Sequence, residues 1–306
     1  MASGLSAKHF HDEQEAYDYV EARIWPNGPM CPHCGGVERV GKLQGKSTRV
    51  GVWKCYQCRK PFTVKIGTIF EDSKVPMHLW LQAMYLIVGS KKGISSNQLH
   101  RILGVTLKTA WFMSHRIREA MQDNDIWPLG GLGASVEADE TFIGNEGLRD
   151  PTKGFHHKMK VFALVERGGR SRAMVVENVN AKTLVPLLRE NVQRLSKLYT
   201  DHAFAYQSAK LYFYHHESVN HSINEWGRGA AHTNTIEGYF SIFKRGMKGI
   251  YQHCAKKHLH RYVAEFNFRY SNRAALGYND ENRTDVLLRG IIGKRLTYQT
   301  ANQARA

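Results

Sequence analysis

Two Cys-x-x-Cys pairs, Cys31 with Cys34 and Cys55 with Cys58, constrain the fold of this chain more than any other feature. Each pair can present two thiolates to one tetrahedral Zn²⁺ ion. A segment this small cannot bury enough core to fold alone, so the ion would supply folding energy. Four unrelated thiols, or a redox motif that needs only one pair, are the competing interpretations. The spacing therefore predicts a structural zinc ribbon.

The charge of the chain indicates a polyanionic partner. The 306 residues carry a formal net charge of +16, and 42% of them are hydrophobic, which is enough for a packed core. The excess is clustered, since Gly238 to Ala264 contains no acidic residue and several basic ones. Charge could serve solubility alone, but this clustering favours nucleic acid as the partner.

The sequence gives no sign of a membrane or secreted protein. No apolar run approaches the roughly 20 residues of a membrane span, and the first residues lack the apolar core of a secretory signal. We therefore predict a cytoplasmic, nucleoid-associated protein with reduced thiols.

A helical period follows the cysteine region, in the segments 77–89, 95–103 and 106–121. Gly104 and Val105 form a turn between the last two, and Thr106 caps the final helix. This pattern predicts a helix-turn-helix whose Lys108, Thr109 and Arg116 contact DNA. An ordinary helical hairpin is the alternative interpretation.

The second half of the chain alternates strand and helix patterns. Strands are expected at 135–141, 159–166 and 173–179, a helix at 182–195, and a further strand ending at Asp201. Helices are expected again from 256 to 289. Such an α/β order predicts a mixed sheet flanked by helices.

Three carboxylates occupy regular elements in this half. Asp139 and Asp201 end predicted strands, and Glu237 lies in a helical segment in which Lys244 returns to the same face. Carboxylates clustered on rigid supports can hold two divalent cations for phosphodiester chemistry, and Lys244 could hold a phosphate. The competing interpretation is that an aspartate at a strand end only forms a turn.

Neighbouring polar residues complicate this assignment. Glu137 shares the strand face of the first aspartate, whereas Glu140 points the other way unless the strand has ended. Asn234 lines the site or caps the helix. The sequence assigns no role to these three residues or to Cys254.

Taken together, these motifs resemble those of bacterial insertion-sequence transposases of the DDE superfamily, in the group with an N-terminal zinc ribbon. Besides the cysteines, the resemblance rests on Val136-Glu-Ala-Asp139-Glu-Thr-Phe-Ile-Gly144, Tyr199-Thr-Asp201 and His232-Thr-Asn-Thr-Ile-Glu237 through Lys244-Arg-Gly. It implies a ribonuclease-H-like, retroviral-integrase-like core with Asp139 and Asp201 as catalytic aspartates and Glu237 as third acid. These acids would hold two Mg²⁺ ions, with Mn²⁺ as a substitute and Asp139 bridging.

The activity implied by this resemblance is cleavage of DNA at insertion-sequence ends and transfer of the 3′-hydroxyl into target DNA. Lys244, Arg245 and Lys248 would grip the DNA backbone, and joining two ends implies a dimer or larger homo-oligomer. Two other classes stay open, namely a zinc-ribbon DNA-binding regulator without catalysis and a ribonuclease-H-like nuclease that does not join strands.

The predicted domain organisation has five parts. They are an N-terminal helix and zinc ribbon (1–72), a helix-turn-helix segment (73–123), a linker (124–133), a ribonuclease-H-like catalytic domain with C-terminal helices (134–290) and a basic tail (291–306).

Overall fold

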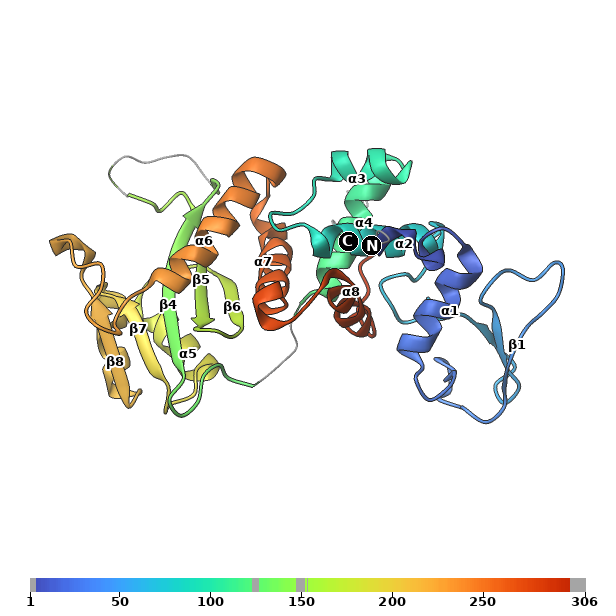
Figure 1. Cartoon of the computed structure of the whole chain (residues 1–306), viewed down its shortest axis with the longest axis horizontal. Coiled ribbons are helices and arrows are strands. Elements are labelled where there is room, and N and C mark those ends of the chain that lie inside the picture. Colours follow the sequence, from blue (N-terminus) through green and yellow to red (C-terminus); the bar gives the residue numbers. More distant parts are fainter. Residues whose placement is uncertain (1–3, 123–126, 147–151, 153, 298–306) are drawn as a thin grey trace, which may run out of the picture. The chain divides into compact units, whose positions relative to one another are not determined.

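The computed structural model describes residues 4–122, 127–146, 152 and 154–297, and the chain divides into two compact units (Figure 1). One unit comprises residues 1–90, 94–122 and 278–306, and the other comprises 91–93 and 123–277. The five-part division stays a prediction. The first residues of the predicted linker, 124–126, and the end of the predicted tail, 298–306, lie outside the described residues.

The first unit begins with a helix and a small antiparallel sheet. Its elements are α1 (Glu13–Ile24), β1 (Val40–Lys42), β2 (Trp53–Cys55) and β3 (Pro61–Phe62), with the strands in the order β1-β2-β3. The Asp12 side chain caps α1 by accepting from the backbone N–H of Glu15. Trp25, Trp53 and Phe62 pack around Cys31 and Cys55 in a core too small to be stable without further support.

The described residues of this unit form four further α-helices: α2 (Met77–Gly89), α3 (Ser96–Leu103), α4 (Leu107–Ala120) and α8 (Asp280–Arg289). The Ser95 and Thr106 side chains cap α3 and α4, and Gly104 ends α3 in a left-handed conformation with φ of +66°. The predicted helices of the 77–121 region are therefore present, whereas a DNA-binding helix-turn-helix remains a prediction. Helix α8 belongs to this unit, although the sequence places it with the catalytic domain; the Tyr19 hydroxyl of α1 donates to Asp285 of α8 at 2.8 Å.

The second unit is built on a mixed five-stranded sheet, as the sequence predicts. The strands are β4 (Ser135–Ile143), β5 (Met159–Glu166), β6 (Ser171–Val176), β7 (Lys197–Asp201) and β8 (His215–Val219), in the order β6-β5-β4-β7-β8. Strands β4, β7 and β8 run parallel, and β5 is antiparallel to both β4 and β6. Strand β8 is not anticipated from the sequence, because its His-His-Glu-Ser-Val segment has no alternating apolar pattern.

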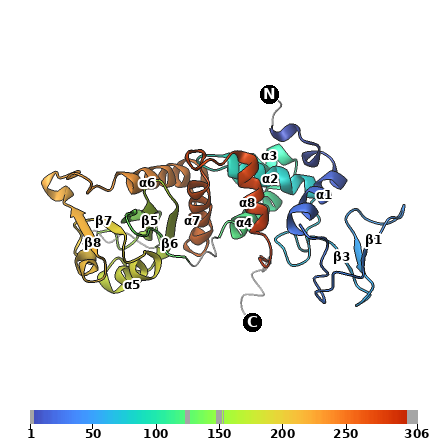
Figure 2. The ribbon, with the colours of Figure 1, turned by 60° about the horizontal axis from the view of Figure 1, so that its bottom comes forward.

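Helices cover both faces of this sheet (Figure 2). Helices α6 (Asn234–Gly246) and α7 (Lys256–Ser271) pack on one face against side chains such as Val161 and Ala163. Helix α5 (Ala181–Asn191) and the 3-10 segment η4 (Phe204–Leu211) pack on the other, against Val136 and Phe162. Shorter turns occur at Gly4–Ser6, Lys8–Phe10, His221–Ile223, Met247–Tyr251 and Ala274–Leu276.

Several predicted boundaries in this unit were wrong by a few residues. Strand β4 runs on to Ile143, so Asp139 lies inside the strand, because pairing with β5 continues after pairing with β7 has ended. Helix α5 ends at Asn191, where Val192 leaves the helical conformation and bridges to Leu129. Among the described residues, no helix is both long and apolar enough to cross a membrane.

Candidate active site and zinc centre

Two of the three predicted acids meet where the parallel pairing of β4 with β7 ends. The ladder between β4 and β7 finishes with Ala138 opposite Thr200, so Asp139 and Asp201 follow at the same level of the sheet. Asp139, Glu140 and Asp201 can each place one carboxylate oxygen within 4.8 Å of the others. The carboxyl ends of neighbouring parallel strands are a common location for ligand sites in α/β sheets.

Burial and mutual repulsion act strongly on these acids. Burial, followed by the charges of Glu140 and Asp201, raises the pKa of Asp139 to about 8. Burial also raises the pKa values of Glu140 and Asp201. Carboxylates held together in this way are stabilised in their charged form by a divalent cation, which prefers oxygen ligands. The donor set therefore suits Mg²⁺ or Mn²⁺.

Glu140 joins this group although strand periodicity directs it to the opposite face from Asp139. Its carboxylate accepts a hydrogen bond from the hydroxyl of Tyr206 in η4. The acidic pair Asp139-Glu140 in the sequence could have indicated this role, whereas nothing in the sequence pointed to Tyr206.

Glu237 lies near this group but is not part of it. Its charge contributes to raising the pKa of Asp139, after burial and the two closer acids. The Thr233 hydroxyl donates to Glu237 Oε1 at 3.1 Å, and His221 Nε2 lies 3.9 Å from the same oxygen. The side chain is 48% exposed. The third predicted acid is thus positioned on α6 with its carboxylate accessible to a ligand.

A pocket of about 390 Å³ adjoins Asp201. Its wall combines polar and apolar surface and is lined by Asp201, His202, Ala203, Tyr206, Gln207, Lys210, His216 and Ser218. Hydrogen bonds between Thr200 and His216 and between His202 and Ser218 hold two of these imidazoles. The pocket offers hydrogen-bonding and cationic groups beside the acids.

Three predicted DNA-contacting cations lie on or just after α6. Lys244, Arg245 and Lys248 are all exposed, as phosphate contact requires. The Arg245 guanidinium also donates to the carbonyl and the hydroxyl oxygen of Ser241, at 3.1 and 2.9 Å.

The helix α4 candidates differ from one another. Lys108 is exposed and Thr109 half-buried, but Arg116 is only 4% exposed. The Arg116 guanidinium donates to the carbonyl oxygens of Glu71 at 2.6 Å and Leu296 at 3.2 Å. The interpretation of Arg116 as a DNA contact is therefore corrected to a structural role, because α4 turns this side chain inward.

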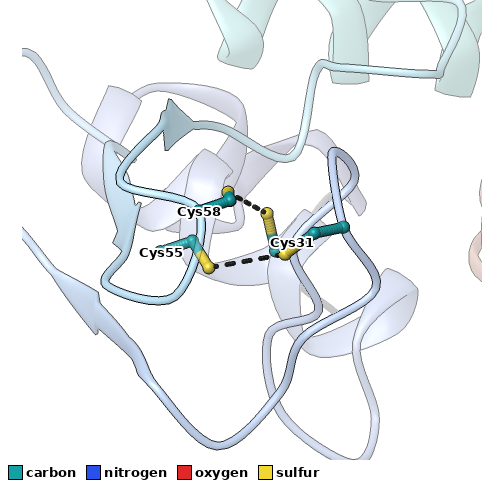
Figure 3. A group of neighbouring side chains, drawn as sticks. Cys31, Cys55 and Cys58 are labelled. Carbon is teal, nitrogen blue, oxygen red and sulfur yellow. Dashed lines mark hydrogen bonds between the residues drawn. The ribbon is translucent and has the colours of Figure 1, made fainter.

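The four cysteines converge as the spacing predicts (Figure 3). The Sγ atoms of Cys31 and Cys58 are 3.7 Å apart, as are those of Cys34 and Cys55. Four sulfurs at 2.3 Å from a tetrahedral zinc ion would be about 3.8 Å apart, so the donor set fits zinc.

The local backbone also favours a thiolate at Cys55. The backbone N–H of Cys58, with a further contribution from that of Gln57, lowers the pKa of Cys55 to about 7. Cys254, by contrast, lies half-buried against the core between the sheet and α6 and α7, far along the chain from this centre.

Comparison with known proteins matches both regions to transposase domains. Residues 128–271 match the ISXO2-like transposase domain, and residues 11–61 match the transposase zinc-ribbon domain. A protein of the transposable element ISH50 from Halobacterium salinarum is 27% identical over 284 residues, covering 87% of this chain and 93% of the relative. A transposase-like protein from Haemophilus influenzae is 29% identical over 99 residues, covering 32% of this chain and 79% of the relative.

Proposed function

We propose that this chain, which belongs to the insertion-sequence transposases with an N-terminal zinc ribbon and an ISXO2-like transposase domain, cleaves DNA at the ends of its element and transfers the 3′-hydroxyl into target DNA. The observation that carries the proposal is the meeting of Asp139, Glu140 and Asp201 at the point where the pairing of β4 with β7 ends. Buried carboxylates with raised pKa values beside a polar pocket are typical of a catalytic site.

Asp139 and Asp201 would hold Mg²⁺ or Mn²⁺, with Glu237 as the third acid. A divalent cation bound there would supply Lewis-acid activation of the phosphate and of the attacking oxygen. Burial keeps Asp139 and Asp201 partly out of water, which strengthens their attraction for a cation. Glu140 competes with Glu237 for the third position, because its oxygen lies closer to the two aspartates.

The rest of the chain would bind and orient DNA. Lys244 and Arg245 provide exposed positive charge from the helix that carries Glu237, and Lys248 provides it from the segment directly after that helix. The zinc ribbon and the segment that contains Lys108 and Thr109 would recognise the element ends. Because two ends must be joined to one target, we expect a dimer or larger assembly on DNA.

Replacing Asp201 with Asn tests the proposal. We expect the variant to lose cleavage by about a thousandfold or more while its affinity for element ends stays within a few-fold, because the basic surface is untouched. Gel-shift and cleavage assays on the same end fragment in Mg²⁺ measure both quantities. Loss of binding together with cleavage would instead make Asp201 a structural aspartate.

Two further comparisons separate the alternatives. Glu237→Gln and Glu140→Gln, assayed side by side, identify the third acid by the larger loss of rate. A strand-transfer assay with pre-cut ends distinguishes a transposase, which yields joined products, from a nuclease, which yields only cuts. A regulator without catalysis would bind the ends and leave every DNA substrate intact.

A further inference from the structure

Glu137 is a fully buried carboxylate for which the metal site gives no explanation. It lies two residues before Asp139 on β4 and is 0% exposed. Burying a charged carboxylate is costly unless its oxygens are hydrogen-bonded and its charge is paired. The partners of Glu137 therefore indicate what the charge is for.

Both carboxylate oxygens of Glu137 have strong donors. Arg167 Nε donates to Oε1 at 2.6 Å, and the backbone N–H of Ile236 donates to Oε2 at 2.9 Å. His232 Nδ1 lies 3.3 Å from Oε1. Ile236 is in the first turn of α6, directly before Glu237, so one oxygen of Glu137 binds the backbone that carries the third acid.

This contact replaces a cap that α6 lacks. The residue at the cap position, Thr233, makes no capping hydrogen bond with its side chain; its hydroxyl donates to Glu237 Oε1 instead. The first N–H groups of a helix need acceptors, and a negative charge at this end is favourable. Glu137 meets both requirements from a neighbouring strand.

Arg167 extends the contact to the chain that precedes the helix. Its two terminal nitrogens donate to the carbonyl oxygens of Ala230 and His232, each at 2.9 Å. Its guanidinium also lies over the ring of Tyr199 on β7, 4.2 Å from the ring centroid. Arg167 thus joins β7, the segment before α6 and the Glu137 carboxylate of β4.

We propose that the Glu137–Arg167 pair is a positioning device that fixes the first turn of α6 against β4 and so sets the distance of Glu237 from Asp139. Glu137 is not one of the clustered acids Asp139, Glu140 and Asp201, and it acts through Glu237. The inference rests on the proposed function in one respect, that Glu237 takes part in catalysis.

The test compares Glu137→Gln with Glu190→Gln, which removes an exposed carboxylate from α5. We expect Glu137→Gln to lower the cleavage rate by about 10- to 100-fold and to raise the Mg²⁺ concentration for half-maximal activity, as supporting residues around metal ligands do. End binding should be unchanged, and Glu190→Gln should match the native chain. If the rate falls but the Mg²⁺ concentration for half-maximal activity does not change, the role of Glu137 is purely structural and the proposal is overturned.

A double variant shows whether Glu137 acts through Glu237. If it does, adding Glu137→Gln to Glu237→Gln should cause little further loss of rate, because the positioned group is already gone. If the loss of rate in the double variant instead equals the product of the losses in the two single variants, the proposal is wrong. Arg167→Lys, which keeps the charge but not the forked contacts, replaces Glu137→Gln throughout if the latter does not fold.

Hydrogen exchange separates failure of this inference from failure of the proposed function. Amides in the first turn of α6 should exchange faster in Glu137→Gln than in the native chain, while those of β4 and β5 stay protected. If Glu237→Gln retains full activity, the catalytic role of Glu237 is wrong, yet faster exchange in Glu137→Gln would still show that the Glu137–Arg167 pair fixes the first turn of α6. Unchanged exchange in Glu137→Gln would overturn the proposal that this pair fixes the first turn of α6, whatever the activity of the protein.

Discussion

Burial and repulsion from the neighbouring carboxylates both raise the pKa of Asp139. Strand β4 loses its β7 partner after Ala138 but stays paired with β5, so Asp139 and Glu140 emerge at an open point in the sheet beside Asp201. The protein keeps this group together through its backbone, at an electrostatic cost that a bound cation would offset. The arrangement therefore links the stability of the metal-free protein to pH.

Replacing Asp139 with Asn should reveal that cost. The ordinary pKa of an aspartate is about 3.9, and the folded protein raises that of Asp139 to about 8. Between these values the folded state binds more protons than the unfolded state, so the contribution of this group to stability is lost as pH rises towards 8. We expect the variant to have a higher Tm than the native chain at pH 8 and a similar Tm near pH 4.

Calorimetry in zinc-containing buffer without Mg²⁺ or Mn²⁺ measures this difference. Adding Mg²⁺ at pH 8 should then raise the Tm of the native chain more than that of the variant, because the cation binds only the folded state. Glu190→Gln controls for the loss of one surface charge. The same Tm difference at both pH values would refute the assigned pKa.

At the scale of elements, local signals were enough for much of the fold. Ser95, Gly104 and Thr106 mark the ends of α3 and α4 by capping chemistry that depends on a few neighbouring residues. The cysteine spacing likewise specifies the ribbon. Strand β8 and segment η4 lack such signals, because their structure depends on pairing with β7 and packing with α5.

The candidate site, like the fold, could be predicted from the sequence only where the signal is local. Asp139 and Asp201 could be predicted because motif and strand position coincide. The hydrogen bond between Glu140 and Tyr206 and the ion pair between Glu137 and Arg167 join residues distant in sequence, and periodicity carries no information about them.

The ribbon gives a prediction at this scale. Its apolar core is small, so removing zinc should unfold it while the five-stranded sheet of the other unit keeps its own melting transition. A zinc chelator and Cys55→Ser should have the same effect. His33→Ala is the matched control, because His33 lies between two ligands but is exposed and is not among the four clustered side chains.

Metal analysis and tryptophan fluorescence measure the outcome. Trp25 and Trp53 pack edge to face in the ribbon with ring centroids 6.1 Å apart, so its unfolding should expose both. An absence of zinc together with an unchanged melting curve in Cys55→Ser would contradict the assignment of these cysteines.

Over the whole molecule, a net charge of +16 leads us to expect that salt is the main control of DNA affinity. That charge is a property of the entire chain, but only side chains that meet phosphates release counterions on binding. Other exposed cations contribute to the long-range attraction alone. The salt dependence of binding therefore distinguishes a phosphate-binding surface from general positive charge.

Changing Lys244, Arg245 and Lys248 together to Gln should reduce that dependence. Each lost phosphate contact makes the slope of log Kobs against log salt shallower by about 0.9, so three contacts account for about 2.7. The control replaces three other exposed cations, Lys182, Arg194 and Lys197, by Gln. Both triple variants lose the same net charge. Equal slopes for the two triple variants, in titrations from low to moderate salt, would mean that these three residues do not contact the DNA backbone. A shallower slope in the Lys244/Arg245/Lys248 variant alone would place the phosphates beside the helix that carries Glu237.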